Sequence, residues 1–259
     1  MSPARAIVVA ALLLTAIPVL ATEIPPGERR SGSSFMTPET QAMQSDDTAN
    51  PGMLWVLDGE ALWKTNAGSA GKACADCHDD AHASMKGVAA RYPAFDKVLG
   101  RPVNLEQRIN LCRANHQQAA PLAYESRELL ALTAFVAQQS RDMPIAAGDD
   151  PQLVPFIAKG RELFTQRQGQ LNLGCANCHD DNWDKHLAGS PITQAHPTGY
   201  PEYRLEWQTL GSLERRLRSC MVGTRAQPYD YGALEMVELE LYLMSRAAGM
   251  PLETPAVRP

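Results

Sequence analysis

The motif Cys-x-x-Cys-His occurs twice in this chain of 259 residues, starting at Cys74 and again at Cys175. Two thiols at this spacing form thioether bonds to the vinyl groups of haem, and the adjacent histidine ligates the iron. A redox dithiol or half of a zinc site is the alternative, but no predicted strand precedes either copy. We therefore predict two covalently attached haems c, held by Cys74, Cys77, Cys175 and Cys178, with His78 and His179 as proximal iron ligands.

Other landmarks repeat in the same order around the two motifs. The segments Gly59-Glu-Ala-Leu-Trp63 and Gly160-Arg-Glu-Leu-Phe164 each begin 15 residues before the first motif cysteine. A Leu-Glu-x-Arg-x-x-x-Cys segment follows each motif and ends at Cys112 or at Cys220. Both copies then close with a Met-Pro pair. Landmarks that keep their order at a nearly constant offset predict a duplicated domain of about 100 residues.

The periodicity of both copies is helical. Apolar residues recur at i, i+3 and i+4 from Ser126 to Arg141 and from Leu234 to Arg246, which predicts the last helix of each copy. Shorter helices are expected before each motif and before each lone cysteine, and alternating strand-like runs are scarce. Asp149-Asp150-Pro151 is typical of a linker. We predict an all-α fold of two domains, residues 51–149 and 150–259.

The sixth iron ligands are less obvious from the sequence. Methionine is the usual ligand in small c-type cytochromes, and Met143 and Met250 follow their histidines at plausible distances. Each of them, however, comes after the last helix, whereas the usual ligand precedes it. Cys112 and Cys220 occupy that earlier position, and a thiolate ligand would lower the potential of the iron. We therefore predict axial thiolates at Cys112 and Cys220.

Three other interpretations of the lone cysteines stay open. They could form a disulfide between the copies, act as buried apolar thiols, or lie beside haems that methionine ligates. The remaining four histidines have no matching partners in the repeat, and surface or supporting positions are expected for His82, His116, His186 and His196. Of these, His116 and His196 are the alternative candidates for the sixth ligand of a haem iron.

The second lone cysteine has the denser basic surroundings. Arg216 precedes Cys220 by four residues and so shares its helical face, although Arg108 has the same spacing to Cys112. Cations favour the nucleophilic thiolate, and guanidinium groups bind oxyanions through two parallel donors. The second copy adds further arginines, which a solvated helix face could also explain, at Arg215, Arg218 and Arg225. We predict that the active site lies in the second domain.

The first residues are typical of an export signal. Arg5 precedes an apolar run from Ala6 to Ile17, and Val19-Leu20-Ala21 is a small-x-small cleavage site. A membrane anchor is the alternative, but the run is short and no later segment reaches the length of a membrane span. We expect a signal peptide over residues 1–21, cleaved near Ala21, and a flexible arm or partner-wrapping segment over residues 22–50. The net charge of −5 argues against nucleic acid as a partner.

From about Met53 to Met250 the chain resembles the SoxA family, the dihaem subunit of the SoxAX cytochrome of bacterial thiosulfate oxidation. The most specific part of the resemblance is the second haem motif together with Arg216 and Cys220. The resemblance implies duplicated class I cytochrome c-like domains in the periplasm. It also implies a heterodimer with a monohaem SoxX-type cytochrome.

The activity that the resemblance implies is that of an L-cysteine S-thiosulfotransferase. Thiosulfate is joined oxidatively to a cysteine of a SoxYZ-type carrier protein, and two electrons pass to a cytochrome acceptor. Cys220 is then both an iron ligand and the active-site cysteine, found as a persulfide, and Arg216 binds the substrate. Cys112 is the thiolate ligand of the first haem, with a structural or electron-holding role. The rivals are a dihaem electron-transfer cytochrome without a substrate, a peroxidase-like enzyme, and a haem-bearing structural subunit.

Overall fold

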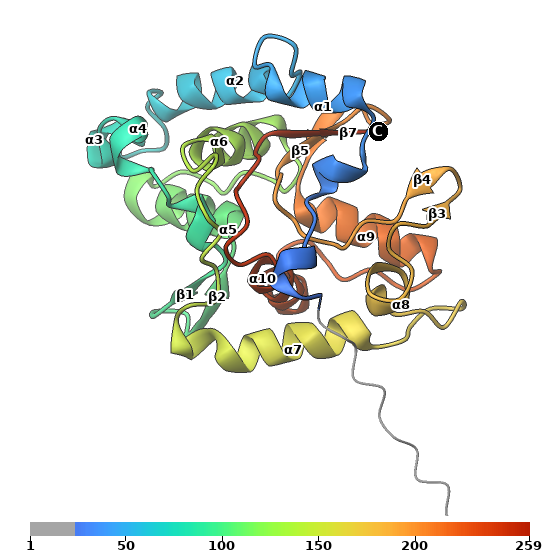
Figure 1. The fold of residues 1–259 in the computed structure, drawn as a ribbon. Coiled ribbons are helices and arrows are strands. Elements are labelled where there is room, and N and C mark those ends of the chain that lie inside the picture. The colour runs from blue at the N-terminus through green and yellow to red at the C-terminus, as the bar shows by residue number, and fades with distance from the viewer. Residues whose placement is uncertain (1–23) are drawn as a thin grey trace, which may run out of the picture.

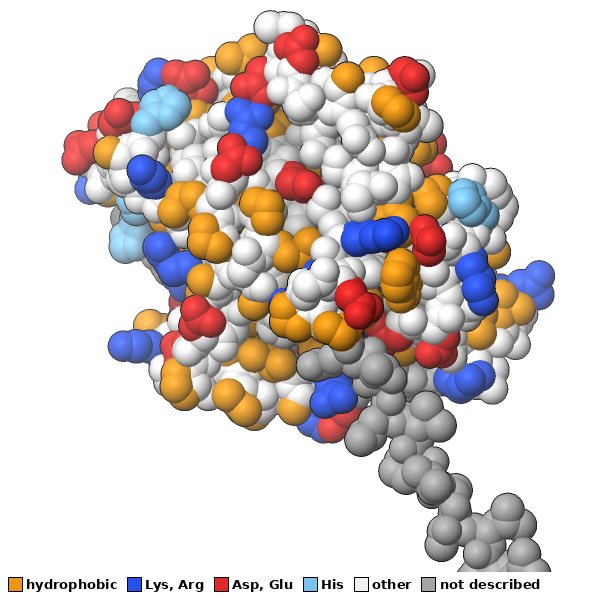
Figure 2. All heavy atoms as spheres, in the orientation of Figure 1, with side chains coloured by type: hydrophobic (Ala, Val, Ile, Leu, Met, Phe, Trp, Pro, Cys, Tyr) orange, Lys and Arg blue, Asp and Glu red, His pale blue; other side chains and the backbone are white. Residues whose placement is uncertain are grey.

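The computed structural model describes residues 24–259, so the expected signal peptide at residues 1–21 lies outside the described residues. Two helical units follow one another along the chain, with α2 on the upper and α7 on the lower side of Figure 1. None of the helices within residues 24–259 has the length and the apolar character that crossing a membrane requires. Side chains of both charge signs are scattered over the face in Figure 2, and apolar side chains gather along its lower edge, where α7 lies.

The first half of the chain contains η1 (Pro26–Glu28), η2 (Gly32–Phe35), α1 (Pro38–Ser45), α2 (Met53–Trp63), α3 (Ala75–His78), α4 (Ala81–Ser84), η3 (Ala89–Arg91), β1 (Ala94–Asp96), β2 (Arg101–Val103), α5 (Leu105–Cys112), η4 (Arg113–Gln117, a π-helix) and α6 (Arg127–Gln138). The second half contains η5 (Pro151–Leu153), α7 (Val154–Thr165), α8 (Cys175–His179), β3 (His186–Leu187), β4 (Ser190–Pro191), β5 (Glu202–Arg204), β6 (Thr209–Gly211), α9 (Leu213–Gly223), α10 (Leu234–Arg246) and β7 (Ala256–Arg258). Most elements of the first unit have a counterpart in the second.

The first unit is built on the crossing of α2 with α6. At the crossing point Gly59 lies against the backbone of α6, where an added Cβ would collide with the carbonyl oxygen of Ala131. Trp63, one turn further along, packs edge-on against Phe135 with ring centroids 5.8 Å apart. A glycine is therefore needed at this point because the two helix backbones approach too closely for any side chain.

The second unit repeats this crossing with α7 and α10. Gly160 lies against the carbonyl oxygen of Glu238, and Phe164 packs on Tyr242 with ring centroids 5.4 Å apart. The repeated glycine and aromatic landmarks of the sequence are thus the contact residues of two equivalent helix crossings. Buried apolar side chains of each last helix complete the two cores.

Short strands correct the all-α expectation. Strands β1 and β2 form an antiparallel hairpin, and β5 and β6 form the equivalent hairpin in the second unit. Strand β7 then adds to β5 in parallel, with Tyr203 opposite Val257, and β3 and β4 form a separate pair. These strands have two or three residues each, too few to produce an alternating pattern in the sequence. The fold is helix-rich with small sheets.

The described part of the expected flexible arm is packed on the body of the molecule. The guanidinium of Arg29 donates to the carbonyl of Ala248 at 3.0 Å, and the amide of Asn50 donates to the carbonyl of Pro255 at 2.8 Å. Helix α1 lies beside β7, as Figure 1 shows near the C-terminus. Residues 24–50 are therefore bound to the surface of the second unit by hydrogen bonds. Their polar composition does not predict these contacts.

Equivalent residues of the two units meet at the joint between them. Pro144 lies opposite Pro251 in an antiparallel bridge, and the flanking amides of Leu252 and Ile145 donate to the carbonyls of the two methionines of the Met-Pro pairs. Ring planes of Tyr124 and Tyr231, also equivalent, stack with centroids 5.7 Å apart. Both Met-Pro pairs thus belong to the joint, where the neighbouring core consists of Ala90, Ile145, Ala147, Met244, Ala247 and Leu252.

Candidate functional site

The two lone cysteines lie on equivalent helices that begin at equivalent caps. The side chain of Asn104 accepts a hydrogen bond from the amide of Gln107 at the start of α5. The hydroxyl of Ser212 accepts one from the amide of Arg215 at the start of α9. Such caps satisfy amides that the first helical turn leaves free, so they fix where each helix starts. Helix α5 ends at its cysteine, whereas α9 continues beyond Cys220 to Gly223.

Helix α9 brings Cys220 to the second Cys-x-x-Cys-His motif. Burial, followed by the negative charge of Cys220, raises the pKa of Cys175 to about 12. The pKa of Cys178 is likewise raised by burial and then by Cys220. The three sulfur atoms therefore lie within electrostatic reach of one another, and all three thiols are free.

Helix α5 makes the same arrangement in the first unit. Burial raises the pKa of Cys74, and Cys112 adds to the effect, while burial and then Cys77 raise the pKa of Cys112. Because all six cysteines are free thiols, Cys112 and Cys220 are not joined by a disulfide, and that alternative is wrong. Each lone cysteine instead belongs to the motif of its own unit.

His179 is held in one orientation by a backbone carbonyl. Its Nδ1 lies 2.6 Å from the carbonyl oxygen of Thr193. Burial lowers the pKa of His179, an effect that Arg216 and Arg246 reinforce, so the ring is neutral near pH 7. A neutral ring that donates from Nδ1 presents the lone pair of Nε2, which is the geometry of a metal-ligating histidine.

His78 is positioned differently. Its ring is exposed and leans on Trp63, with centroids 5.7 Å apart at an interplanar angle of 38°. The indole of Trp63 in turn donates to the carbonyl of Asp79 at 3.1 Å. Within residues 24–259 the ring of His78 makes no hydrogen bond. The first histidine is therefore packed by an aromatic ring, and the second is oriented by a hydrogen bond.

Arg216 lies close to Cys220 without a carboxylate to neutralise it. Burial by itself would lower the pKa of Arg216, but the negative charges of Cys220, Tyr200 and Glu202 raise it. No carboxylate oxygen of residues 24–259 lies within 4.0 Å of its guanidinium. A half-buried cation beside a thiol can stabilise the thiolate and can bind an oxyanion.

Arg108, the equivalent arginine of the first unit, is already paired. Its guanidinium donates to Asp96 at 2.7 Å and to the hydroxyl of Tyr92 at 3.2 Å. The carboxylate of Asp96 is 9% exposed and the Arg108 side chain 33%, so the carboxylate is the shielded member of the pair. Arg108 and Arg216 have the same spacing to their cysteines, but only Arg216 has no carboxylate partner and can bind another anion.

The other arginines of the second site have separate contacts. Arg215 stacks on Trp207 at 4.1 Å and lies 3.8 Å from Glu125. Arg218 covers the ring of Tyr231 at 4.5 Å, and its Nη1 is buried without a hydrogen-bond partner among the described residues. Arg225 is exposed and contacts a glutamine at 3.5 Å. Of these three arginines, Arg218 is the one that retains a buried donor without a partner.

Four glutamates, two of them buried and two half-buried, lie at the joint, close to the starts of the two cysteine helices. Glu214 accepts hydrogen bonds from Asn104 at 3.0 Å and from the amide of Gly232 at 2.7 Å. Burial, reinforced by the equivalent Glu106, raises the pKa of Glu214 to about 8. Burial also raises the pKa of each of the others, namely Glu106, Glu125 and Glu240. The Glu of the repeated Leu-Glu-x-Arg segment is thus part of the joint.

The residues that support His179 were not predicted from the sequence. Arg246 donates to Asp180 at 2.7 Å, and these two side chains are 5% and 3% exposed. The sequence signal was weak, because Arg246 looks like an ordinary basic residue in the last turn of a helix. The role of Thr193 resides in its backbone carbonyl and has no sequence signal. Of the two alternative candidates for a sixth ligand, His196 is buried against the N-terminal segment and His116 lies in η4.

Comparison with known proteins gives concordant results. The family model described as SoxA/TsdA, cytochrome c domain, matches twice, at residues 58–145 and 159–252. The L-cysteine S-thiosulfotransferase subunit SoxA of Pseudaminobacter salicylatoxidans is 40% identical over 89% of this chain and 81% of its own length. The corresponding subunit of Rhodovulum sulfidophilum is 38% identical over 89% and 80%. The crystal structure of SoxXA from P. pantotrophus superposes with a TM-score of 0.86 at 30% identity, covering 89% of this chain and 87% of that one.

Proposed function

Because this chain belongs to the SoxA/TsdA cytochrome c domain family and, within it, to the SoxA subunits of L-cysteine S-thiosulfotransferase, we propose that its second unit contains the thiosulfate-coupling site. Membership implies haem c as the cofactor. The two matched regions fall within residues 51–149 and 150–259, which we propose as duplicated class I cytochrome c-like domains with one haem each.

The residues of the second unit fit a covalent haem. Cys175 and Cys178 are free thiols on one short helix, and His179 presents Nε2 while Nδ1 is hydrogen-bonded. Cys220 is the proposed other axial ligand. In the first unit the corresponding set is Cys74, Cys77, His78 and Cys112. When bound, the haem accepts and passes on single electrons, and a thiolate ligand keeps its potential low.

We assign Arg216 to binding of the substrate and Cys220 to bond formation with it. The Arg216 guanidinium binds the sulfonate oxygens of thiosulfate and directs its terminal sulfur towards the sulfur of Cys220. The single observation that carries this proposal is the pairing of a free thiol with an arginine that has no carboxylate partner within residues 24–259. The closed Arg108–Asp96 pair makes the first unit unsuitable for the same reaction.

The proposed reaction has two steps. The Cys220 thiolate and the terminal sulfur of thiosulfate form a sulfur–sulfur bond, and two electrons leave to a cytochrome acceptor. A carrier cysteine thiolate then attacks the sulfur that was the terminal atom of thiosulfate, and the Cys220 thiolate departs. The carrier gains a thiosulfate group through a disulfide bond, and Cys220 is regenerated. Atoms and charge balance when the two electrons are counted.

The partners follow from the family. The matched crystal structure is that of SoxXA, so we propose a SoxX-type monohaem cytochrome as the partner subunit of this chain. A SoxYZ-type protein is the proposed carrier. We also propose a periplasmic location, reached through the signal peptide.

Replacement of Cys220 tests the proposal most directly. We expect Cys220→Ala to abolish coupling of thiosulfate to the carrier, whereas the matched Cys112→Ala variant keeps part of it. After incubation with thiosulfate and an oxidised cytochrome acceptor in the absence of the carrier, mass measurement of proteolytic peptides should find a thiosulfate group on the Cys220 peptide and none on the Cys112 peptide. Undiminished coupling by the Cys220→Ala protein with both haems attached would rule out the proposed role of this cysteine.

A further inference from the structure

The carbonyl that orients His179 belongs to a stretch without regular structure. Residues 192–197 follow β4 and form no helix or strand. Thr193 lies in this stretch and receives the Nδ1 hydrogen bond of His179 at 2.6 Å. Backbone hydrogen bonds to Asp184 and Lys185 hold Ile192 at the start of the stretch, but no such ladder continues past Thr193. The orientation of His179 therefore depends on whatever fixes this loop.

Arg246 fixes the loop from the side of the protein core. Its Nη2 donates to Asp180 at 2.7 Å and to the carbonyl of Gln194 at 3.4 Å. The guanidinium also lies on the face of Phe164 at 4.6 Å, which keeps it from swinging away. Asp180 directly follows His179, so one arginine joins the histidine's own helix to the residue after Thr193. Removing this cation would leave a buried carboxylate unpaired.

The N-terminal segment holds the same loop from the other side. The amide of Arg30 donates to the side chain of Gln194 at 2.6 Å, and that side chain donates to the carbonyl of Glu28 at 3.1 Å. Nδ1 of His196 lies 2.9 Å from the carbonyl oxygen of Arg30. Burial lowers the pKa of His196 to about 4, so this ring stays neutral and keeps the hydrogen bond near pH 7.

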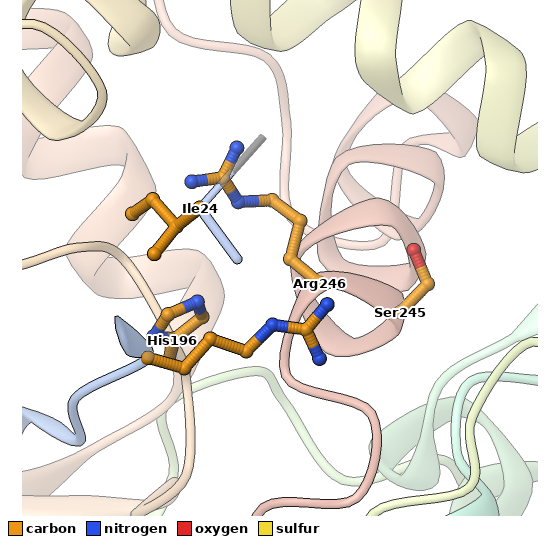
Figure 3. A pocket seen from close by; sticks show the side chains of 5 residues that line it. Ile24, His196, Ser245 and Arg246 are labelled. Atoms are coloured by element: carbon orange, nitrogen blue, oxygen red, sulfur yellow. The ribbon is translucent and has the colours of Figure 1, made fainter. Parts of the chain in front are cut away.

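A cavity of about 70 Å³ separates these two supports. Figure 3 shows the side chain of Arg246 reaching from α10 towards Ile24, with His196 on the opposite wall. The Nε of Arg246 is buried and has no hydrogen-bond partner among the described residues. Nη1 donates to the hydroxyl of Tyr242 at 3.4 Å, so the guanidinium is held at both terminal nitrogens, with Nη2 directed at the loop and at Asp180.

The first unit has no such support among the described residues. Gln139, which caps the C-terminus of the equivalent helix α6, occupies the position of Arg246, and its side-chain amide donates to the carbonyl of Phe135 in that helix at 2.9 Å. Asp79, the equivalent of Asp180, is exposed. The buried ion pair is thus specific to the unit in which we place the chemistry.

We propose that Arg246 is a positioning residue for His179, acting with the Glu28–Arg30 segment to hold the carbonyl of Thr193 under the imidazole Nδ1. The inference rests on the proposed function, because it takes His179 as the iron ligand of the second haem. A firm Nδ1–H···O=C bond makes the imidazole a stronger electron donor. Arg246 therefore contributes to a low potential of the second haem, the one that must receive electrons from sulfur.

The test compares Arg246→Gln with Arg246→Lys in the mature protein with both haems attached. Because loss of the buried cation would by itself lower the potential, the Gln change is combined with Asp180→Asn, which removes the ion pair without changing the net charge. Spectroelectrochemical titration should place the second haem of this Gln variant at a higher potential than in the wild type, with the first haem unchanged. Its low-spin electron paramagnetic resonance signal should shift or broaden as the imidazole turns more freely. Lysine keeps a cation for Asp180 and should restore most of both readouts. The matched control Gln139→Ala should leave both potentials unchanged.

A second variant decides the matter if Arg246→Gln does not fold. Gln194→Ala removes the two hydrogen bonds to the N-terminal segment and leaves Arg246 intact, so it should raise the same potential by a smaller amount. Wild-type potentials and spectra in the variants that retain both haems would overturn the role of Arg246. Failure of the proposed function looks different, because it is seen as undiminished thiosulfate coupling by the Cys220→Ala protein, a readout that does not involve Arg246.

Discussion

The two units use the same elements for two different sites. In the first, the arginine four residues before the lone cysteine is bound to Asp96, and His78 is exposed beside Trp63. In the second, the equivalent Arg216 has no such carboxylate within residues 24–259, and His179 is hydrogen-bonded to a backbone carbonyl. The comparison shows that the Cys-x-x-Cys-His motif is the same in both units. What differs is whether a carboxylate neutralises the arginine near the lone cysteine, and this decides whether the arginine can bind an anion.

The strongest test of the equivalence between the units lies at the helix crossings. Gly160→Ala would place a Cβ against the carbonyl oxygen of Glu238, and Gly59→Ala would place one against that of Ala131. We expect each change to cost about 3 kcal/mol or more, since overpacking of a rigid backbone contact cannot relax by side-chain motion. Chemical denaturation monitored by far-ultraviolet circular dichroism measures this. Gly223→Ala is the control, since a Cβ there meets no atom within 4 Å.

The two arginines should separate the functions of the units. We expect Arg216→Gln to reduce the rate of thiosulfate coupling by about 10- to 100-fold, since one charge-assisted hydrogen-bonded contact is worth about 1.5–3 kcal/mol. Arg108→Gln should change the rate little and should instead destabilise the first unit, because it leaves Asp96 half-satisfied. Steady-state kinetics with thiosulfate as the varied substrate distinguishes the two. An equal reduction of the coupling rate in both variants would contradict the placement of the substrate site in the second unit alone.

The smallest effect that we expect concerns the glutamates that both units place at the joint. The folded-state pKa of Glu214 is about 8, above its ordinary 4.5, so the folded protein holds a proton that the unfolded chain releases between these values. The free energy of unfolding should therefore fall as pH rises through this window, by about 1 kcal/mol between pH 6 and pH 7. Glu214→Gln should flatten this dependence, and the half-exposed control Glu60→Gln should not. Denaturant titrations at a series of pH values provide the measurement.

The sequence predicted the parts of the fold that depend on side-chain type and spacing. Gly59 and Gly160 mark the helix crossings, and Cys112 and Cys220 each lie beside their own haem motif. It could not predict what depends on distant backbone groups. The pairing of β7 with β5, the carbonyl of Thr193 under His179, and the docking of residues 24–50 all join segments far apart in the chain. Nor could spacing reveal that Asp96 neutralises Arg108, because that contact crosses from the β1 hairpin to α5.

The joint between the units has the form of a symmetric interface. Pro144 faces Pro251 and Tyr124 faces Tyr231, so equivalent residues meet one another across an approximate two-fold axis. A surface that pairs with a copy of itself is the mark of a symmetric homodimer. The two units of this chain therefore meet as the two protomers of a symmetric dimer would, but within one covalent chain.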